Sequence, residues 1–332
     1  MRDYLRKHEG ETRLFIVLAL LVVGLGVAAP SFLSAGNIAS LLNNNAVNVI
    51  WAVGLLVVLI AGGIDISFAV GASVVQYLTA IALSRLGGGN WMLGLVLAGS
   101  FGIALGCINA AFVAGFRIIS IVVTIATFNA FFGLLMFATS GKSIYDLPDW
   151  WTDRVAVASL GDGGALTLPV AAMVACMTAT WFLIDRTTIG RQLYAFGDNP
   201  DGARRAGVPT VTMQFIAYGW MGLMAGIGGL MQVNIAQEVV PNALIGRELD
   251  VLAAVVLGGA RLGGGRGSVL GCFLGVLLVA VVQNGLNLLG VSPYAFKMVI
   301  GLTILVAISF SNVDLFARLW GGSGRRGDAK AH

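Results

Sequence analysis

The sequence predicts an all-α, polytopic membrane protein with about ten transmembrane helices, on three observations. Hydrophobic residues make up 58% of the 332 residues and charged residues only 11%, whereas soluble domains carry roughly 25% charged residues. Apolar stretches of about 20 residues, the length needed to cross a bilayer, recur along the chain. The 46 glycines suit close contacts between helices in lipid. We therefore expect one membrane domain over residues 1–332, with the lipid bilayer as its surroundings.

The apolar stretches give ten candidate spans. In chain order they are 14–33, 46–62, 66–85, 91–115, 118–139, 165–185, 212–233, 249–260, 268–290 and 294–312. The second and the eighth are short. The first follows several basic residues, as a signal peptide does, but Pro30 stands where cleavage would be expected. We therefore read it as an uncleaved first helix.

The distribution of basic residues predicts the orientation. With the N-terminus in the cytoplasm, fifteen of the 20 lysines and arginines fall on the cytoplasmic side and five on the far side. The positive-inside rule favours this orientation over its inverse. Both termini are then cytoplasmic, with tails at 1–13 and 313–332, and a further cytoplasmic loop covers residues 186–211.

That loop contains the polar segment GDNPDGARRAGV, between the sixth and seventh spans. Asp198 or Asn199 can cap a helix that Pro200 opens, and Gly207 with Pro209 can end it. The segment predicts a short surface helix that carries two adjacent arginines. It is either an ordinary solvated loop or a docking element for a soluble cytoplasmic partner.

Two pairs of similar stretches indicate an internal repeat. Asp65 in GGIDIS aligns with Asp250 in GRELDV, and Asn109 in NAAFVAG aligns with Asn284 in NGLNLLG. Five spans is an odd number, so the second copy must enter the membrane from the opposite side. We therefore expect two inverted repeats of five helices, which are typical of transporters with a substrate path at the repeat interface.

Asp65 and Asp250 each lie at the expected start of a helix. Either acid can be an N-terminal cap stabilised by the helix dipole, or a substrate or gating contact. Neither is read as a proton carrier, because the spans contain almost no ionisable groups for a proton relay.

The chain lacks the features of an enzyme. In Gly141-Lys142-Ser143, the phosphate-binding motif would need a glycine at 136, where Met136 stands. The two histidines lie near the chain ends, and the three cysteines lie singly within apolar runs, so no metal, cofactor or catalytic group is expected. Active transport by this chain would need a partner to drive it.

Four ordered motifs together resemble a known family. They are GGIDIS at 62–67, GRQLYAFGDNPDGARRAGV at 190–208, ELDVLAAVVLGGARLGGGRGS at 248–268 and NGLNLLGVSP at 284–293. These resemble the permease subunits of bacterial ABC importers for simple sugars, which include ribose, xylose and galactose systems and the importer of the furanosyl quorum-sensing signal. The resemblance runs from about Asn37 to Ile308.

This resemblance implies a set of partners in the bacterial inner membrane. Two permease subunits, identical or different, form the pore; a cytoplasmic ATP-binding subunit docks on the loop between spans six and seven; and a periplasmic protein delivers the sugar. No nucleic acid is expected. The residues that match the coupling region are Asn199, Pro200, Asp201, Ala203, Arg204, Arg205 and Gly207. Gly202 departs from the pattern, because alanine is more usual there and glycine costs about 1 kcal/mol in a helix.

A sugar pore needs neutral side chains that form hydrogen bonds, because sugars carry hydroxyls rather than charge. Our candidates for the substrate path are Asn44, Asn48, Gln76 and Asn129. Each of them could instead bind one helix to another.

Two other functions stay open. One is a permease for branched-chain amino acids, and the other is a secondary carrier coupled to an ion gradient. Such a carrier would need more acidic or histidine side chains within the spans than this sequence has.

Overall fold

The structure is a computed structural model that describes residues 9–161, 163–292, 295, 298, 301 and 302. Within them, eight helices are long and apolar enough to cross a membrane. They are α2 (Glu9–Ala28), α3 (Ala35–Ile60), α4 (Phe68–Arg85), α5 (Trp91–Phe116), α6 (Ser120–Thr139), α8 (Leu168–Trp181) continued by η2 (Phe182–Arg186), α11 (Thr210–Ala236) and α13 (Val269–Leu288). The all-α polytopic fold predicted from the sequence is confirmed.

Two of the ten predicted spans differ from this set. The eighth, 249–260, corresponds to α12 (Arg247–Leu257), which has 11 residues. At roughly 1.5 Å per residue α12 is about 16 Å long, about half the ~30 Å hydrocarbon core, so it cannot cross alone. Most of the tenth span, 294–312, lies outside the described residues, as do the expected tail 313–332 and most of the tail 1–13. The two-repeat arrangement therefore stays a prediction.

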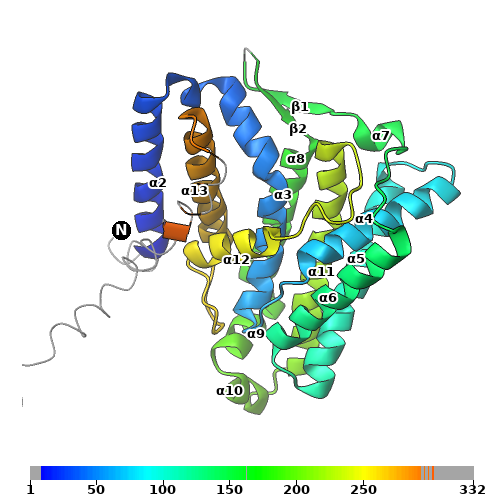
Figure 1. Cartoon of the computed structure of the whole chain (residues 1–332). Helices are drawn as coiled ribbons and strands as arrows, with labels where there is room; N and C mark the ends of the chain where they lie inside the picture. The colour runs from blue at the N-terminus through cyan, green and yellow to red at the C-terminus, as the bar shows by residue number, and fades with distance from the viewer. Residues whose placement is uncertain (1–8, 162, 293–294, 296–297, 299–300, 303–332) are drawn as a thin grey trace, which may run out of the picture.

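Short elements lie at the two ends of the helical bundle (Figure 1). One end carries η1 (Pro30–Leu33), α7 (Asp149–Thr152) and the antiparallel strands β1 (Ala156–Ser159) and β2 (Ala165–Thr167). The opposite end carries α9 (Thr188–Asp198) and α10 (Pro200–Arg205). The β1–β2 hairpin was not predicted and adds a small β element to one end of the helical fold.

Helix α3 forms the centre of the core. From Ala46 to Ile60 all but one of its residues are buried, the exception being the partly buried Asn48. A helix that is apolar on all sides is expected to be surrounded by other helices. α3 packs against α8, α11, α12 and α13, so its N-terminal half, which carries several asparagines, is held among the helices of the second half of the chain.

Glycines permit a close approach of helices α5 and α11. A Cβ on Gly102 would overlap the carbonyl oxygen of Gly222, and a Cβ on Gly222 would overlap that of Gly102. Small residues at such crossings let backbones approach closely, as is common in membrane helices. The high glycine content of the sequence is thus used for packing.

Candidate functional site

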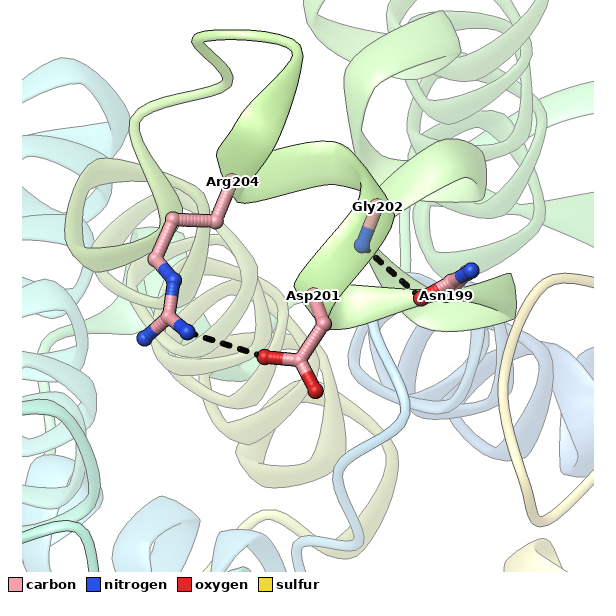
Figure 2. Close-up of polar contacts among 4 residues, drawn as sticks. All are labelled: Asn199, Asp201, Gly202 and Arg204. Carbon is pink, nitrogen blue, oxygen red and sulfur yellow. Dashed lines mark hydrogen bonds and ion pairs between the residues drawn. The ribbon is translucent and has the colours of Figure 1, made fainter.

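The predicted helix in the polar segment is α10, and its cap is Asn199. The Asn199 side-chain oxygen accepts a hydrogen bond from the Gly202 N–H at 2.9 Å, and Pro200 occupies the first helical position (Figure 2). Arg204 donates to Asp201 at 3.0 Å, and both side chains are well exposed. An exposed pair of this kind contributes little stability. The helix and its cap are confirmed, and the helix ends at Arg205.

A large hollow opens beside α10. Its volume is about 620 Å³, and its lining includes Asp201 and Arg204 of α10 together with Arg117, which follows α5, and Ser120 at the start of α6. The exposed charges of α10 therefore border a concave surface of mixed polarity.

Helix α9 joins α10 to the bundle through a glycine junction, which we define as Gly197, Ile60, Gly264 and Gly265. A Cβ on Gly197 would overlap the Ile60 carbonyl oxygen, and one on Gly264 would lie 2.5 Å from the Gly197 oxygen. The Gly265 N–H donates to the same Ile60 oxygen at 2.9 Å. The end of α3, the end of α9 and the loop between α12 and α13 therefore meet here through backbone atoms.

Tyr194 adds a side-chain contact beside the glycine junction. Its hydroxyl donates to the Gly267 carbonyl at 2.8 Å. Burial, together with the negative charges of Asp185 and Glu11, raises the pKa of this hydroxyl well above its usual range, so it remains a proton donor. Helix α9 is thus fixed both to the end of α3 and to the loop that joins α12 to α13.

A polar cavity lies elsewhere on the bundle, between α3, α12 and α13. Its volume is about 310 Å³. The polar residues that line it are Asn44, Asn45 and Asn48 of α3, Arg247 and Asp250 of α12, and Gln283 of α13, and the apolar ones are Val251, Ala254, Val276 and Val279. Two of the four predicted path residues and one of the two predicted helix-start acids therefore share one cavity.

The start of α12 is held in place by a local contact. Gly246 precedes the helix with φ 92°, a left-handed conformation that glycine adopts without strain. Both carboxylate oxygens of Glu248 lie 3.0 Å from the Gly246 nitrogen, which donates to them. Arg247 donates to the Gln232 side-chain oxygen at 3.3 Å. These contacts orient the helix turn that carries Arg247 and Asp250.

The other predicted path residues lie away from this cavity. Gln76 is buried and donates to the Gly229 carbonyl at 3.1 Å, so it joins α4 to α11. Asn129 is exposed on α6 and donates to the Ile125 carbonyl of its own helix at 2.8 Å. Neither is among the residues that line the two cavities described above.

Asp65 has a different environment from Asp250. It is buried, and its carboxylate accepts hydrogen bonds from the Ser67 N–H at 2.8 Å and the Ser67 hydroxyl at 2.7 Å. Asn109 donates to the Ser67 hydroxyl oxygen at 2.7 Å. Asp65 thus orders the turn before α4 and joins it to α5, while Asp250 is exposed at the cavity.

Asn284, which the repeat pairs with Asn109, exchanges two 2.9 Å hydrogen bonds with Asn37. The aligned asparagines therefore bind different partners. Both contacts join helices within the chain, which agrees with an architectural role for the two asparagines.

Sequence reasoning missed Arg247 and Asn45 as members of the polar cavity. Arg247 stands three residues before Asp250, and residues at this spacing share one face of a helix. That spacing was the available signal for Arg247.

Among the residues that the structure describes, no group of His, Cys, Asp and Glu side chains could hold a metal ion.

Two comparisons with known proteins match most of the chain. A family model described as the permease component of the branched-chain amino acid transport system matches residues 37–308. The chain is 32% identical to the ribose import permease protein RbsC of Escherichia coli (strain K12), over 91% of this chain and 94% of that protein. It is 34% identical to the protein of the same name from Bacillus subtilis (strain 168), over 89% and 90%.

A third relative is the L-arabinose transport system permease protein AraH of Escherichia coli (strain K12). It is 30% identical, over 90% of this chain and 89% of that protein. No solved structure matches the chain significantly.

Proposed function

This chain belongs to the permease family of binding-protein-dependent ABC importers, and from that premise we propose that it carries a simple sugar across the bacterial inner membrane. It is a transport component, and ATP hydrolysis belongs to a separate subunit. The family description names branched-chain amino acids, but several relatives that align over nine-tenths of the chain are named for ribose or L-arabinose.

The polar cavity is the observation that carries the proposal. Asn44 and Asn48, proposed as path residues because a sugar needs neutral hydrogen-bonding groups, line it with Gln283. Amide side chains both donate and accept hydrogen bonds, as hydroxyls do. The volume of about 310 Å³ lies at the lower end of the roughly 300–1,000 Å³ typical of small-molecule sites. Both features suit a single small sugar.

The coupling role of α10 is supported by its exposure and by the glycine junction. An ATP-binding subunit that contacts Asn199 to Gly207 would act on a helix fixed, through α9, to the end of α3. Helix α3 also carries Asn44 and Asn48, so a displacement of α10 can be transmitted through α9 and along α3 to the polar cavity. The predicted orientation, with fifteen of 20 basic residues in the cytoplasm, puts α10 on the side where ATP is available.

The complete importer includes further partners. A second permease subunit, the same chain or a different one, would complete the pore, and a periplasmic protein would deliver the sugar. An ion-coupled carrier is not favoured, because the matched relatives are permease subunits of ABC importers.

Uptake by the assembled importer tests the substrate class. The permease, its ATP-binding subunit and the binding protein encoded beside it are reconstituted in proteoliposomes and offered labelled D-ribose, L-arabinose, D-xylose, D-galactose and L-leucine. We expect ATP-dependent uptake of at least one sugar and none of leucine. Uptake of leucine without uptake of any sugar would assign the chain to amino acid transport.

A further inference from the structure

We propose that Arg247 and Asp250 are specificity-determining residues of the permease, which contact the cargo in the polar cavity and select a neutral, polyhydroxylated molecule. The inference rests on the proposed function and adds to it the groups by which the permease itself distinguishes its cargo. Both side chains lie on α12 and line the cavity together with the asparagines of α3 and Gln283 of α13.

The location of the pair argues for contact with water or cargo rather than lipid. Helix α12 lies between the end of the bundle that carries β1 and β2 and the end that carries α10 (Figure 1). Asp250 is exposed on the surface of the chain. Charged side chains at membrane depth face protein or water-filled cavities, because their exposure to lipid is costly. This face of α12 therefore borders the path rather than the acyl chains.

The charges of the pair indicate the class of cargo. Arg247 offers only hydrogen-bond donors and Asp250, when ionised, only acceptors. Arg247 and Asp250 interact electrostatically with each other and together carry no net charge, so neither an anion nor a cation in the cavity gains a net attraction from the pair. A neutral molecule with neighbouring hydroxyls can accept from Arg247 and donate to Asp250, and such charge-assisted hydrogen bonds are stronger than those between neutral groups.

The rigidity of the helix turn makes the pair selective. The Glu248–Gly246 contact fixes the start of α12, and Gln232 accepts from Arg247. Groups held in place lose little conformational freedom when cargo arrives. A site built to bind a hydroxyl rejects an analogue without it, because its polar groups are then left without partners.

A zwitterionic amino acid could also satisfy one acid and one base. Asn45 and Asn48 each already donate one hydrogen bond within the chain, to the Leu41 carbonyl at 3.0 Å and to the Asn45 side-chain oxygen at 3.2 Å. An amino acid would still leave their remaining groups and the amides of Asn44 and Gln283 facing its apolar side chain. Burying unpaired amides is unfavourable, so the number of amides in the cavity favours a polyhydroxylated molecule.

Relative uptake of two sugars tests the inference. The reconstituted importer is offered D-ribose and 2-deoxy-D-ribose, and the ratio of their uptake rates is compared between wild type, Asp250→Asn and Arg247→Gln. The same binding protein is used with every variant, so its own preference for one of the two sugars cancels when the ratios are compared. We expect both variants to lower the ratio by about tenfold, the effect of losing one charge-assisted hydrogen bond. Asp153→Asn and Arg85→Gln, which change exposed charges outside the cavity, should keep the wild-type ratio.

Wild-type ratios in both cavity variants would overturn the inference while leaving the proposed function intact. Failure of the wild type to import any of the sugars, with uptake of L-leucine, would overturn the proposed function and the inference together. Co-purification of each variant with the ATP-binding subunit shows that it has folded.

A second measurement needs no knowledge of the cargo. Asn48→Cys and Asp250→Cys in the full-length chain should react with a charged, water-soluble thiol reagent in nanodiscs. Leu20→Cys, at a 68% exposed apolar position midway along α2, should not. Absence of labelling at both cavity positions would overturn the inference, whatever the importer carries.

Discussion

The backbone of Gly197 lies directly against the carbonyl oxygen of Ile60, so that no β-carbon fits between them. Gly197 belongs to α9, beside the predicted docking helix α10, and Ile60 is the last residue of α3, which lines the polar cavity with three asparagines. The contact therefore connects the two parts of the candidate site.

Replacing Gly197 by alanine should separate ATP hydrolysis from transport. The added methyl must displace the end of α3 or α9, and we expect sugar uptake to fall more than tenfold while ATP hydrolysis by the complex continues. Gly115→Ala, at a position with no atoms within 4 Å of the new Cβ, is the matched control. Normal uptake by Gly197→Ala would show that the glycine junction is not needed for coupling.

Removing the cap of α10 should weaken binding of the ATP-binding subunit. Asn199→Ala removes the acceptor for the Gly202 N–H, and the loss of such a cap costs about 1 kcal/mol, which corresponds to roughly fivefold in affinity. Asn199→Ser retains a capping oxygen and should bind as wild type does. Titration of the solubilised permease with the ATP-binding subunit measures both, and equal affinities for the two variants would contradict the role of the cap.

Reversing the charges of α10 should weaken the same association more strongly. Both Arg204 and Arg205 are exposed on α10, so Arg204→Glu combined with Arg205→Glu should reduce co-purification of the ATP-binding subunit without unfolding the spans. The double variant Arg85→Glu/Lys142→Glu reverses two exposed charges elsewhere and serves as the control. Co-purification and uptake at wild-type levels in the α10 variant would remove the assignment of this helix.

The Tyr194 hydroxyl should make stability depend on high pH. Its pKa is raised in the folded chain, whereas an unfolded tyrosine titrates near 10. The folded state therefore binds this proton more tightly, so the stabilisation is complete below pH ~10 and is lost as the pH rises further. The melting temperature of the wild type should fall more steeply between about pH 9.5 and 11 than that of Tyr194→Phe. Parallel curves would contradict the prediction.

The sequence identified the elements that depend on local chemistry. Apolar length located eight helices, and Pro200 with Asn199 located the start of α10, because caps and spans are set by a few neighbouring residues. It could not distinguish a full span from the half-length α12, because 249–260 contains the right residue types and only the tertiary fold shows where the helix begins.

The polar path residues show the limit of reasoning from residue type. Asn48 and Gln76 are both amides within apolar helices, yet Asn48 lines a cavity and Gln76 binds a neighbouring backbone. The difference depends on whether the helix face that carries the amide points into a cavity or packs against another helix. Residue type alone does not determine this. Asp65 and Asp250 differ for the same reason.

We propose above all that a separate subunit drives this chain through α9 and α10. The most direct measurement is sugar uptake into proteoliposomes that contain the binding protein and the permease, with the active ATP-binding subunit, with a variant of that subunit unable to hydrolyse ATP, or with none. We predict uptake only with the active subunit and ATP. Hydrolysis of ATP by the purified permease alone, or sugar uptake driven by an ion gradient without the other subunits, would contradict the claim.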